Sequence, residues 1–231
     1  MQTLGMIGGL GPESTIDYYR QLIAAYRKRT TDDSYPAIVI TSLDVSKALR
    51  LLGGQQYAEL ADYFTRGIDQ LTRAGATVGL ISANTPHIVF DQVQPRSPIP
   101  LISIVEAACA AVQQQGMSKV ALLGTRYTMQ AHFYPDVFSR AGIALVVPTD
   151  EEQSFIHEKY VSELIPGVFL DPTRENLLHI IRRMREEDGI QGVLLAGTEL
   201  PLILRQQDVP EVPLLDTTVI HVEAAVTRLL S

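Results

Sequence analysis

The sequence contains one cysteine, no tryptophan and few aromatic residues. Because a disulfide needs two cysteines and a thiolate metal site needs several, Cys109 alone excludes both within one chain. Cys109 lies in an alanine-rich segment with a helical pattern, residues 104–112, so we expect a buried thiol rather than a reactive one. The five histidines are scattered and have no metal-ligand spacing, so we expect no metal site.

The sequence also lacks an excess of basic residues and any long apolar run. There are 19 lysines and arginines against 26 aspartates and glutamates, a formal net charge of −7. This balance argues against a nucleic-acid partner, because phosphate backbones are bound by clustered cations. No run approaches the roughly 18–20 apolar residues of a membrane span. A secretory leader has a long uninterrupted apolar segment, whereas glycines and Pro12 interrupt the first apolar residues of this sequence. We therefore expect a cytoplasmic protein with no membrane partner.

Short apolar runs alternate along the chain with amphipathic helical stretches. Such alternation predicts an α/β protein with mostly parallel, doubly wound sheets. The predicted strands are residues 3–7, 37–42, 78–82, 100–102, 119–123, 144–147, 192–196 and 213–215. The main predicted helices are residues 14–29, 56–74, 105–115, 173–187 and 218–230.

Four segments recur in the same order at an offset of about 113–116 residues. Leu4-Gly-Met-Ile-Gly8, for example, matches Val120-Ala-Leu-Leu-Gly124. The repeat predicts two pseudo-symmetric lobes, residues 1–113 and 114–231, with a ligand cleft between them. The last helix is placed so that it can pack back on the first lobe.

The first strand runs into a glycine-rich turn that opens a helix at Pro12. The amides of Gly9 and Gly11, together with the helix dipole, suit a carboxylate or phosphate. A dinucleotide site needs a third glycine that is absent here, and a tight turn without a ligand is the structural alternative. Thr125 and Thr128 occupy the matching loop of the second half as candidate donors, with helix capping by Thr125 as the alternative.

Two further strands end in polar turns, Leu80-Ile-Ser-Ala-Asn-Thr-Pro-His87 and Leu194-Leu-Ala-Gly-Thr-Glu-Leu-Pro201. The amide, hydroxyl and ionisable side chains in these turns suit binding and proton transfer, whereas turn closure is the structural alternative. Lys159 is a candidate cation for a ligand carboxylate, with surface solvation as its alternative. The candidate residues in the two turns are Asn84, Thr85, His87, Thr198 and Glu199.

These two turns and the opening Met6-Ile-Gly-Gly-Leu-Gly-Pro-Glu-Ser-Thr15 resemble the aspartate/glutamate racemase family over the whole chain. The resemblance implies a cofactor-independent amino-acid racemase, an isomerase of amino-acid metabolism. It also implies a homodimer and a small acidic amino acid or dicarboxylate, such as aspartate or glutamate, as substrate. In that family one cysteine removes the α-proton and a second cysteine, from the other lobe, delivers a proton to the opposite face.

The positions that match the two cysteines are Ser82 and Gly197, which therefore define the expected catalytic neighbourhood. A serine hydroxyl is several units more basic than a thiol, whose pKa is about 8.5, and it needs a partner to take its proton. Because Gly197 has no side chain, a two-thiol mechanism is impossible. Three alternatives remain: racemisation with substitutes such as His87 and Glu199, related carbanion chemistry (a decarboxylase or isomerase), or binding of small carboxylates without turnover.

Overall fold

The computed structural model describes residues 2–231, which form two compact units. The first unit contains the chain up to Ile104 together with Thr218–Ser231, and the second is Val105–Thr217. The division thus falls at the start of a helix, α5 (Ile104–Gln114), whereas the repeat predicted a boundary at residues 113/114. The helices α5 and α11 (Thr217–Leu230) are exchanged between the halves. Almost all of α5, from the first half of the sequence, belongs to the second unit, and almost all of α11, from the second half, belongs to the first unit.

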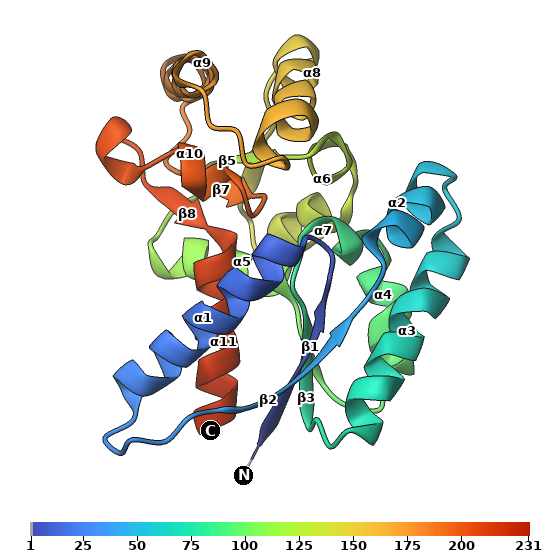
Figure 1. The fold of residues 1–231 in the computed structure, drawn as a ribbon. Helices are drawn as coiled ribbons and strands as arrows, with labels where there is room; N and C mark the ends of the chain where they lie inside the picture. The colour runs from blue at the N-terminus through green and yellow to red at the C-terminus, as the bar shows by residue number, and fades with distance from the viewer. Residues whose placement is uncertain (1) are drawn as a thin grey trace. The chain divides into compact units, whose positions relative to one another are not determined.

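The sheet of the first unit has four parallel strands in the order β2-β1-β3-β4 (Figure 1). Side chains alternate between its two faces. Leu4 and Met6 of β1 pack with residues of α1 and α11, whereas Ile7 packs on the opposite face with α3. The strands are β1 (Thr3–Gly8), β2 (Ala37–Ser42), β3 (Val78–Ile81) and β4 (Leu101–Ile102).

Helices cover both faces of this sheet. The first of them, α1 (Pro12–Arg29), has Pro12 at its start, an acidic residue in its first turn and basic residues in its last turn, which all favour a helix there. The other helices are α2 (Val45–Gly53), α3 (Tyr57–Arg73), η1 (Thr85–Val89), α4 (Phe90–Val93) and η2 (Gln94–Arg96), together with α11.

The second unit repeats the topology, with four parallel strands in the order β6-β5-β7-β8. The predicted doubly wound α/β class is therefore confirmed in both units. The strands are β5 (Lys119–Gly124), β6 (Ala144–Val146), β7 (Val193–Ala196) and β8 (Leu214–Asp216). The helices besides α5 are α6 (Arg126–Gln130), α7 (Phe133–Arg140), α8 (Asp150–Lys159), η3 (Tyr160–Leu164), α9 (Asp171–Arg183), η4 (Met184–Asp188), α10 (Leu200–Ile203) and η5 (Gln206–Asp208).

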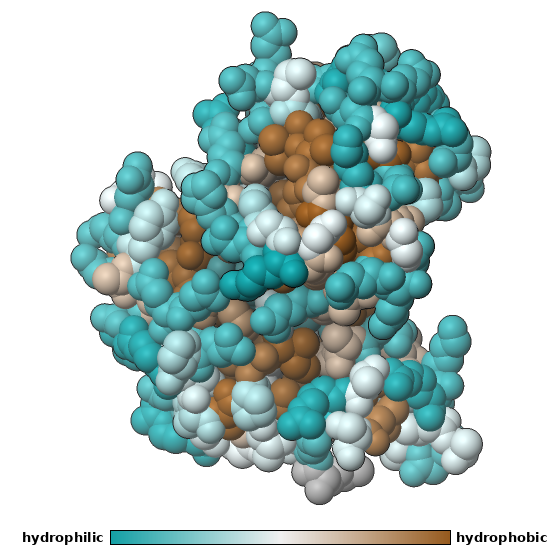
Figure 2. Space-filling view, turned by 180° about the vertical axis from the view of Figure 1, so that it is seen from behind, coloured by the Kyte–Doolittle hydropathy of each residue, from teal (hydrophilic) through white to brown (hydrophobic). Residues whose placement is uncertain are grey.

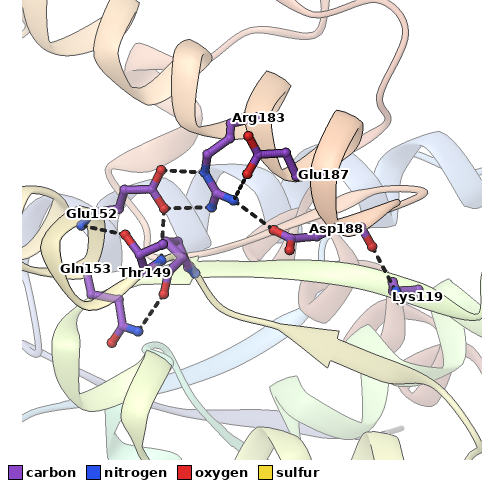
Figure 3. Close-up of polar contacts among 8 residues, drawn as sticks. Lys119, Thr149, Glu152, Gln153, Arg183, Glu187 and Asp188 are labelled. Carbon is purple, nitrogen blue, oxygen red and sulfur yellow. Dashed lines mark hydrogen bonds and ion pairs between the residues drawn. The ribbon is translucent and has the colours of Figure 1, made fainter.

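An arginine-centred network joins α8 to α9 in the second unit (Figure 3). Arg183 Nε and Nη2 donate to the two carboxylate oxygens of Glu152, each at 2.7 Å, and Nη1 lies 3.1 Å from Asp188. Burial raises the pKa of Glu152, but the hydrogen bonds from Arg183 and Thr149 outweigh it and leave the pKa below its ordinary value. This bidentate pair fixes α8, whose C-terminal end leads directly into Tyr160.

The face shown in Figure 2 is mainly hydrophilic, with several apolar patches. In the second unit, one ten-residue segment after Tyr160 exposes large apolar side chains, namely Val161, Ile165, Val168, Phe169 and Leu170. Among residues 2–231 there is no helix with both the length and the apolar character needed to cross a membrane.

Candidate functional site

The strand order places one topological switch point in each unit. In open α/β sheets ligands bind outside the carboxyl ends of the strands where the order reverses. In the first unit these are the ends of β1 and β3, and Ser82 N–H donates to Ile7 O at 3.0 Å across them. In the second unit they are the ends of β5 and β7, where Gly124 is the register partner of Ala196. The predicted site residues other than Lys159 lie in the segments that follow these four strands.

The turn after β1 requires glycine at position 9. Gly9 has φ +77°, and a Cβ there would lie 2.3 Å from Leu43 O and 2.5 Å from Ser42 Oγ. Its N–H donates to Thr15 Oγ1 at 2.8 Å, so this amide already has an internal partner. Gly11 (φ +133°) caps α1, and its carbonyl accepts hydrogen bonds from Thr15 N and Oγ1.

Ser82 is the residue after β3 and is buried, with 1% of its surface exposed. Its hydroxyl donates to the carbonyl of Ile7 at 2.8 Å, and its own carbonyl accepts from Ser14 Oγ at 3.2 Å. A carbonyl orients the hydroxyl but does not take its proton, so this contact does not activate Ser82 as a base.

His87 is held by main-chain groups at both ring nitrogens. Nδ1 lies 3.0 Å from Ala83 O, and Nε2 accepts from Ile104 N–H at 3.2 Å, which together place the proton on Nδ1. Burial, and then the neighbouring His221, lower the pKa of His87 to about 3. The ring is therefore neutral near pH 7 and has no free nitrogen for a substrate proton. The structure does not form the Ser82–His87 hydroxyl network that an enzyme using this pair would need.

Asn84 and Thr85 begin η1, directly after Ser82 and Ala83. Asn84 is buried, and its carbonyl accepts a hydrogen bond from His87 N–H at 2.9 Å. Thr85 is partly buried. A main-chain hydrogen bond therefore closes the turn. Asn84 and Thr85 both lie just beyond the carboxyl end of β3.

In the second unit Thr125 caps α6, because its Oγ1 accepts from Thr128 N–H at 3.3 Å. The two hydroxyl oxygens lie 3.2 Å apart, and Thr128 is fully buried. The capping interpretation is therefore confirmed. Lys159 forms an ion pair with Glu163 at 2.7 Å, and this hydrogen bond raises the pKa of the lysine. Lys159 is at the C-terminal end of α8, outside the strand-end turns.

The space beside Gly197 is filled by the ring of Tyr160. A Cβ on Gly197 would lie 2.5 Å from Tyr160 Oη, 2.8 Å from Cε2 and 3.0 Å from Cζ. The Tyr160 hydroxyl donates a short hydrogen bond to Glu199 Oε2, which also accepts from Thr198 Oγ1 at 2.8 Å. Burial, and then the charge of Glu199, raise the pKa of Tyr160 well above its ordinary value. Tyr160, Thr198 and Glu199 thus form one connected polar group at the end of β7.

Sequence reasoning missed Tyr160 and Ser14. Ser14 was part of the quoted motif but had no assigned contact, and Tyr160 lies 37 positions from Gly197. The only signal for Tyr160 was indirect, since the loss of a side chain at Gly197 leaves room for a large residue from elsewhere. The buried state predicted for Cys109 is confirmed, and burial raises the pKa of its thiol.

The fold and these turns define a two-unit α/β protein with polar groups at the switch point of each unit. The family described as Asp/Glu/Hydantoin racemase matches residues 7–225. The chain belongs to the Asp/Glu/hydantoin racemase family, which confirms the resemblance found in the sequence.

Two solved structures and one sequence relative illustrate the similarity. An aspartate racemase homologue from Pyrococcus horikoshii OT3 is 35% identical with a TM-score of 0.87, and each chain is covered in full. The broad specificity amino-acid racemase RacX of Bacillus subtilis is 23% identical over 99% of this chain and 98% of its own. The Picrophilus torridus aspartate racemase has the same fold, with 22% identity, a TM-score of 0.77, and coverage of 100% of this chain and 93% of its own.

Proposed function

We propose that the protein is a cofactor-independent isomerase that exchanges the α-proton of a small acidic amino acid, such as aspartate or glutamate. The observation that carries this proposal is the position of Glu199, an ionisable carboxylate beside Gly197 at the switch point of a racemase-family unit. A relative described as a broad specificity amino-acid racemase and a solved aspartate racemase homologue support the reaction class.

The neighbouring donors supply the binding groups of this proposal. Asn84, Thr85, Thr125 and Thr198 lie at the strand ends, where hydroxyls and amides stabilise a substrate carboxylate and the charge that develops on it. Lys159 is the proposed cation for the distal carboxylate, which would then compete with Glu163 for the ammonium group. A cytoplasmic location and a homodimer complete the proposal and rest on composition and family membership.

The test is α-proton exchange in D2O, followed by ¹H NMR, with L- and D-aspartate and L- and D-glutamate. We expect the α-proton signal to disappear and the opposite enantiomer to form. Glu199→Gln should slow exchange by about 100-fold or more, because an amide cannot take a proton. Glu175→Gln, at an exposed glutamate on α9, is the matched control and should leave the rate unchanged.

A binding function without turnover is the second candidate, and the contact of Ser82 with a main-chain carbonyl favours it. Calorimetric titration with the same four amino acids separates the two. Binding without exchange would replace the racemase proposal with a carboxylate-binding protein. Exchange without inversion would instead indicate one-sided carbanion chemistry.

A further inference from the structure

We propose that Tyr160 and Glu199 together replace the second thiol: Tyr160 exchanges a proton with the substrate α-carbon, and Glu199 holds the proton that the phenol gives up. The inference rests on the proposed function and names the acid–base group that serves it from the second unit. Tyr160 is not among the positions that match the cysteines of the family.

Tyr160 occupies the space of a side chain at position 197. The Tyr160 oxygen lies 2.5 Å from where the Cβ of any side chain at position 197 would be. The phenol therefore occupies the space that a cysteine at this position would need, and it places an O–H group there. Glycine at 197 and tyrosine at 160 are consistent with one another, since any larger residue at 197 would collide with this ring.

Proton transfer through Tyr160 to Glu199 balances. When the substrate loses its α-proton, the Cα–H bond breaks, an O–H bond forms at Tyr160, and the original phenol proton moves to the Glu199 carboxylate. The electron pair stays on the α-carbon, and the reverse steps return the proton. Burial and Glu199 raise the pKa of Tyr160, so the phenol is protonated near pH 7 and passes a proton on rather than acting as a phenolate.

The Tyr160 hydroxyl oxygen is held in place from several sides. Thr198 Oγ1 donates to the same carboxylate oxygen that Tyr160 contacts, and Glu199 N–H points at Tyr160 Oη across 3.5 Å. The Arg183–Glu152 pair fixes the helix that precedes Tyr160 (Figure 3). A proton-transfer group has to be held in this way, because small displacements of the reacting atoms lower the rate steeply.

The experiment compares Tyr160→Phe with Tyr134→Phe, which removes another buried hydroxyl of the second unit, one bonded to Thr217. Exchange and inversion of aspartate are measured by NMR and chiral chromatography, and aspartate binding by calorimetry. We expect Tyr160→Phe to lower exchange by about 100-fold or more, with aspartate affinity preserved within about threefold. Tyr134→Phe should retain exchange within about threefold. Full exchange by Tyr160→Phe would overturn the inference.

If the unmodified protein catalyses no exchange, the proposed function is wrong, but the role of Tyr160 can still be tested. The test then uses a protein that carries Ser82→Cys. The new thiol then supplies one proton group, and inversion needs a second one. We expect Ser82→Cys to invert aspartate, and Ser82→Cys/Tyr160→Phe to lose inversion while Ser82→Cys/Tyr134→Phe keeps it. Absence of inversion in Ser82→Cys, or equal inversion with and without the Tyr160 hydroxyl, would reject Tyr160 as the proton group.

Discussion

Gly9 combines a backbone angle that favours glycine with surroundings that leave no space for a side chain. Its φ is +77°, and a Cβ would lie 2.3 Å from the carbonyl oxygen of Leu43. We expect Gly9→Ala to lower the free energy of unfolding by about 3 kcal/mol, from the left-handed conformation and from the collision with a main-chain atom that cannot rotate away. Urea unfolding followed by circular dichroism measures this loss.

Gly116 is the matched control because it has nearly the same φ, +69°, and nothing lies within 4 Å of its Cβ position. Gly116→Ala should therefore cost only the conformational part, about 1 kcal/mol. Equal losses in the two variants would show that the β1 turn relaxes around an added methyl group. The turn would then tolerate side chains, and its close packing would not be a requirement of the site.

At the scale of elements, α8 begins with a capping box. Thr149 Oγ1 accepts from Glu152 N–H at 3.3 Å, and Thr149 N–H donates to the Glu152 carboxylate at 2.9 Å. We expect Thr149→Ala to destabilise the protein by about 1 kcal/mol, because a main-chain donor of the first turn loses its partner. The same urea measurement tests this prediction.

Thr149→Ser keeps the hydroxyl and should recover most of that stability. Since α8 leads into Tyr160, the two variants also separate helix stability from chemistry. Both should keep the exchange rate of the unmodified protein under conditions where they are fully folded. If Thr149→Ala were as stable as Thr149→Ser, the side-chain cap of α8 would contribute nothing to the free energy of unfolding.

The sequence was most informative about strands. Each predicted strand is observed to within one residue at either end, because runs such as residues 120–124 are apolar and buried on both faces of a parallel sheet. The short helices α2 and α7 and the polar helix α8 were not predicted. Only Gln153 and Ile156 of α8 are buried, so its apolar periodicity is weak even though its capping residues are clear.

The site was predictable only as far as the strand ends were. The turns containing Ser82 and Gly197 follow directly from the ends of β3 and β7, which the alternating pattern located. The contact between Gly197 and Tyr160 could not be predicted from the pattern. It depends on how the chain between α8 and β7 folds, which brings two distant residues together. For His87 the residue type made a base one candidate role, with a structural role as the alternative. Its position after a tight turn gives both ring nitrogens main-chain partners.

At the scale of the whole molecule, the two units share one topology but differ in the buried groups that titrate. The first unit encloses two histidines with lowered pKa values, about 3 for His87 and about 4 for His221, and burial is the main cause for each. His221 lies between the Tyr18 hydroxyl at 3.1 Å and the carbonyl of Ile102 at 2.9 Å. The units should therefore respond differently to acid, and the first should lose stability sooner.

An unfolded histidine has a pKa of about 6.5, so between that value and about pH 4 these two side chains are protonated in the unfolded chain only. Their contribution to stability is thus complete above about pH 6.5 and decreases as the pH falls, by about 1.4 kcal/mol per unit for each histidine. At pH 5 the loss reaches about 4 kcal/mol for the pair.

Urea unfolding from pH 7.5 to 4.5 tests this acid sensitivity, with His87→Gln as the variant, since glutamine keeps a donor and an acceptor but does not titrate. The decrease in unfolding free energy between pH 6.5 and 5 should be about half as steep in His87→Gln as in the unmodified protein. His179→Gln, at an exposed histidine of α9, should leave the slope unchanged. An unaltered slope in His87→Gln would show that His87 binds a proton in the folded chain as readily as in the unfolded one. The neutral ring bonded to Ala83 and Ile104 would then not describe this turn in solution, and His87 would return as a candidate base.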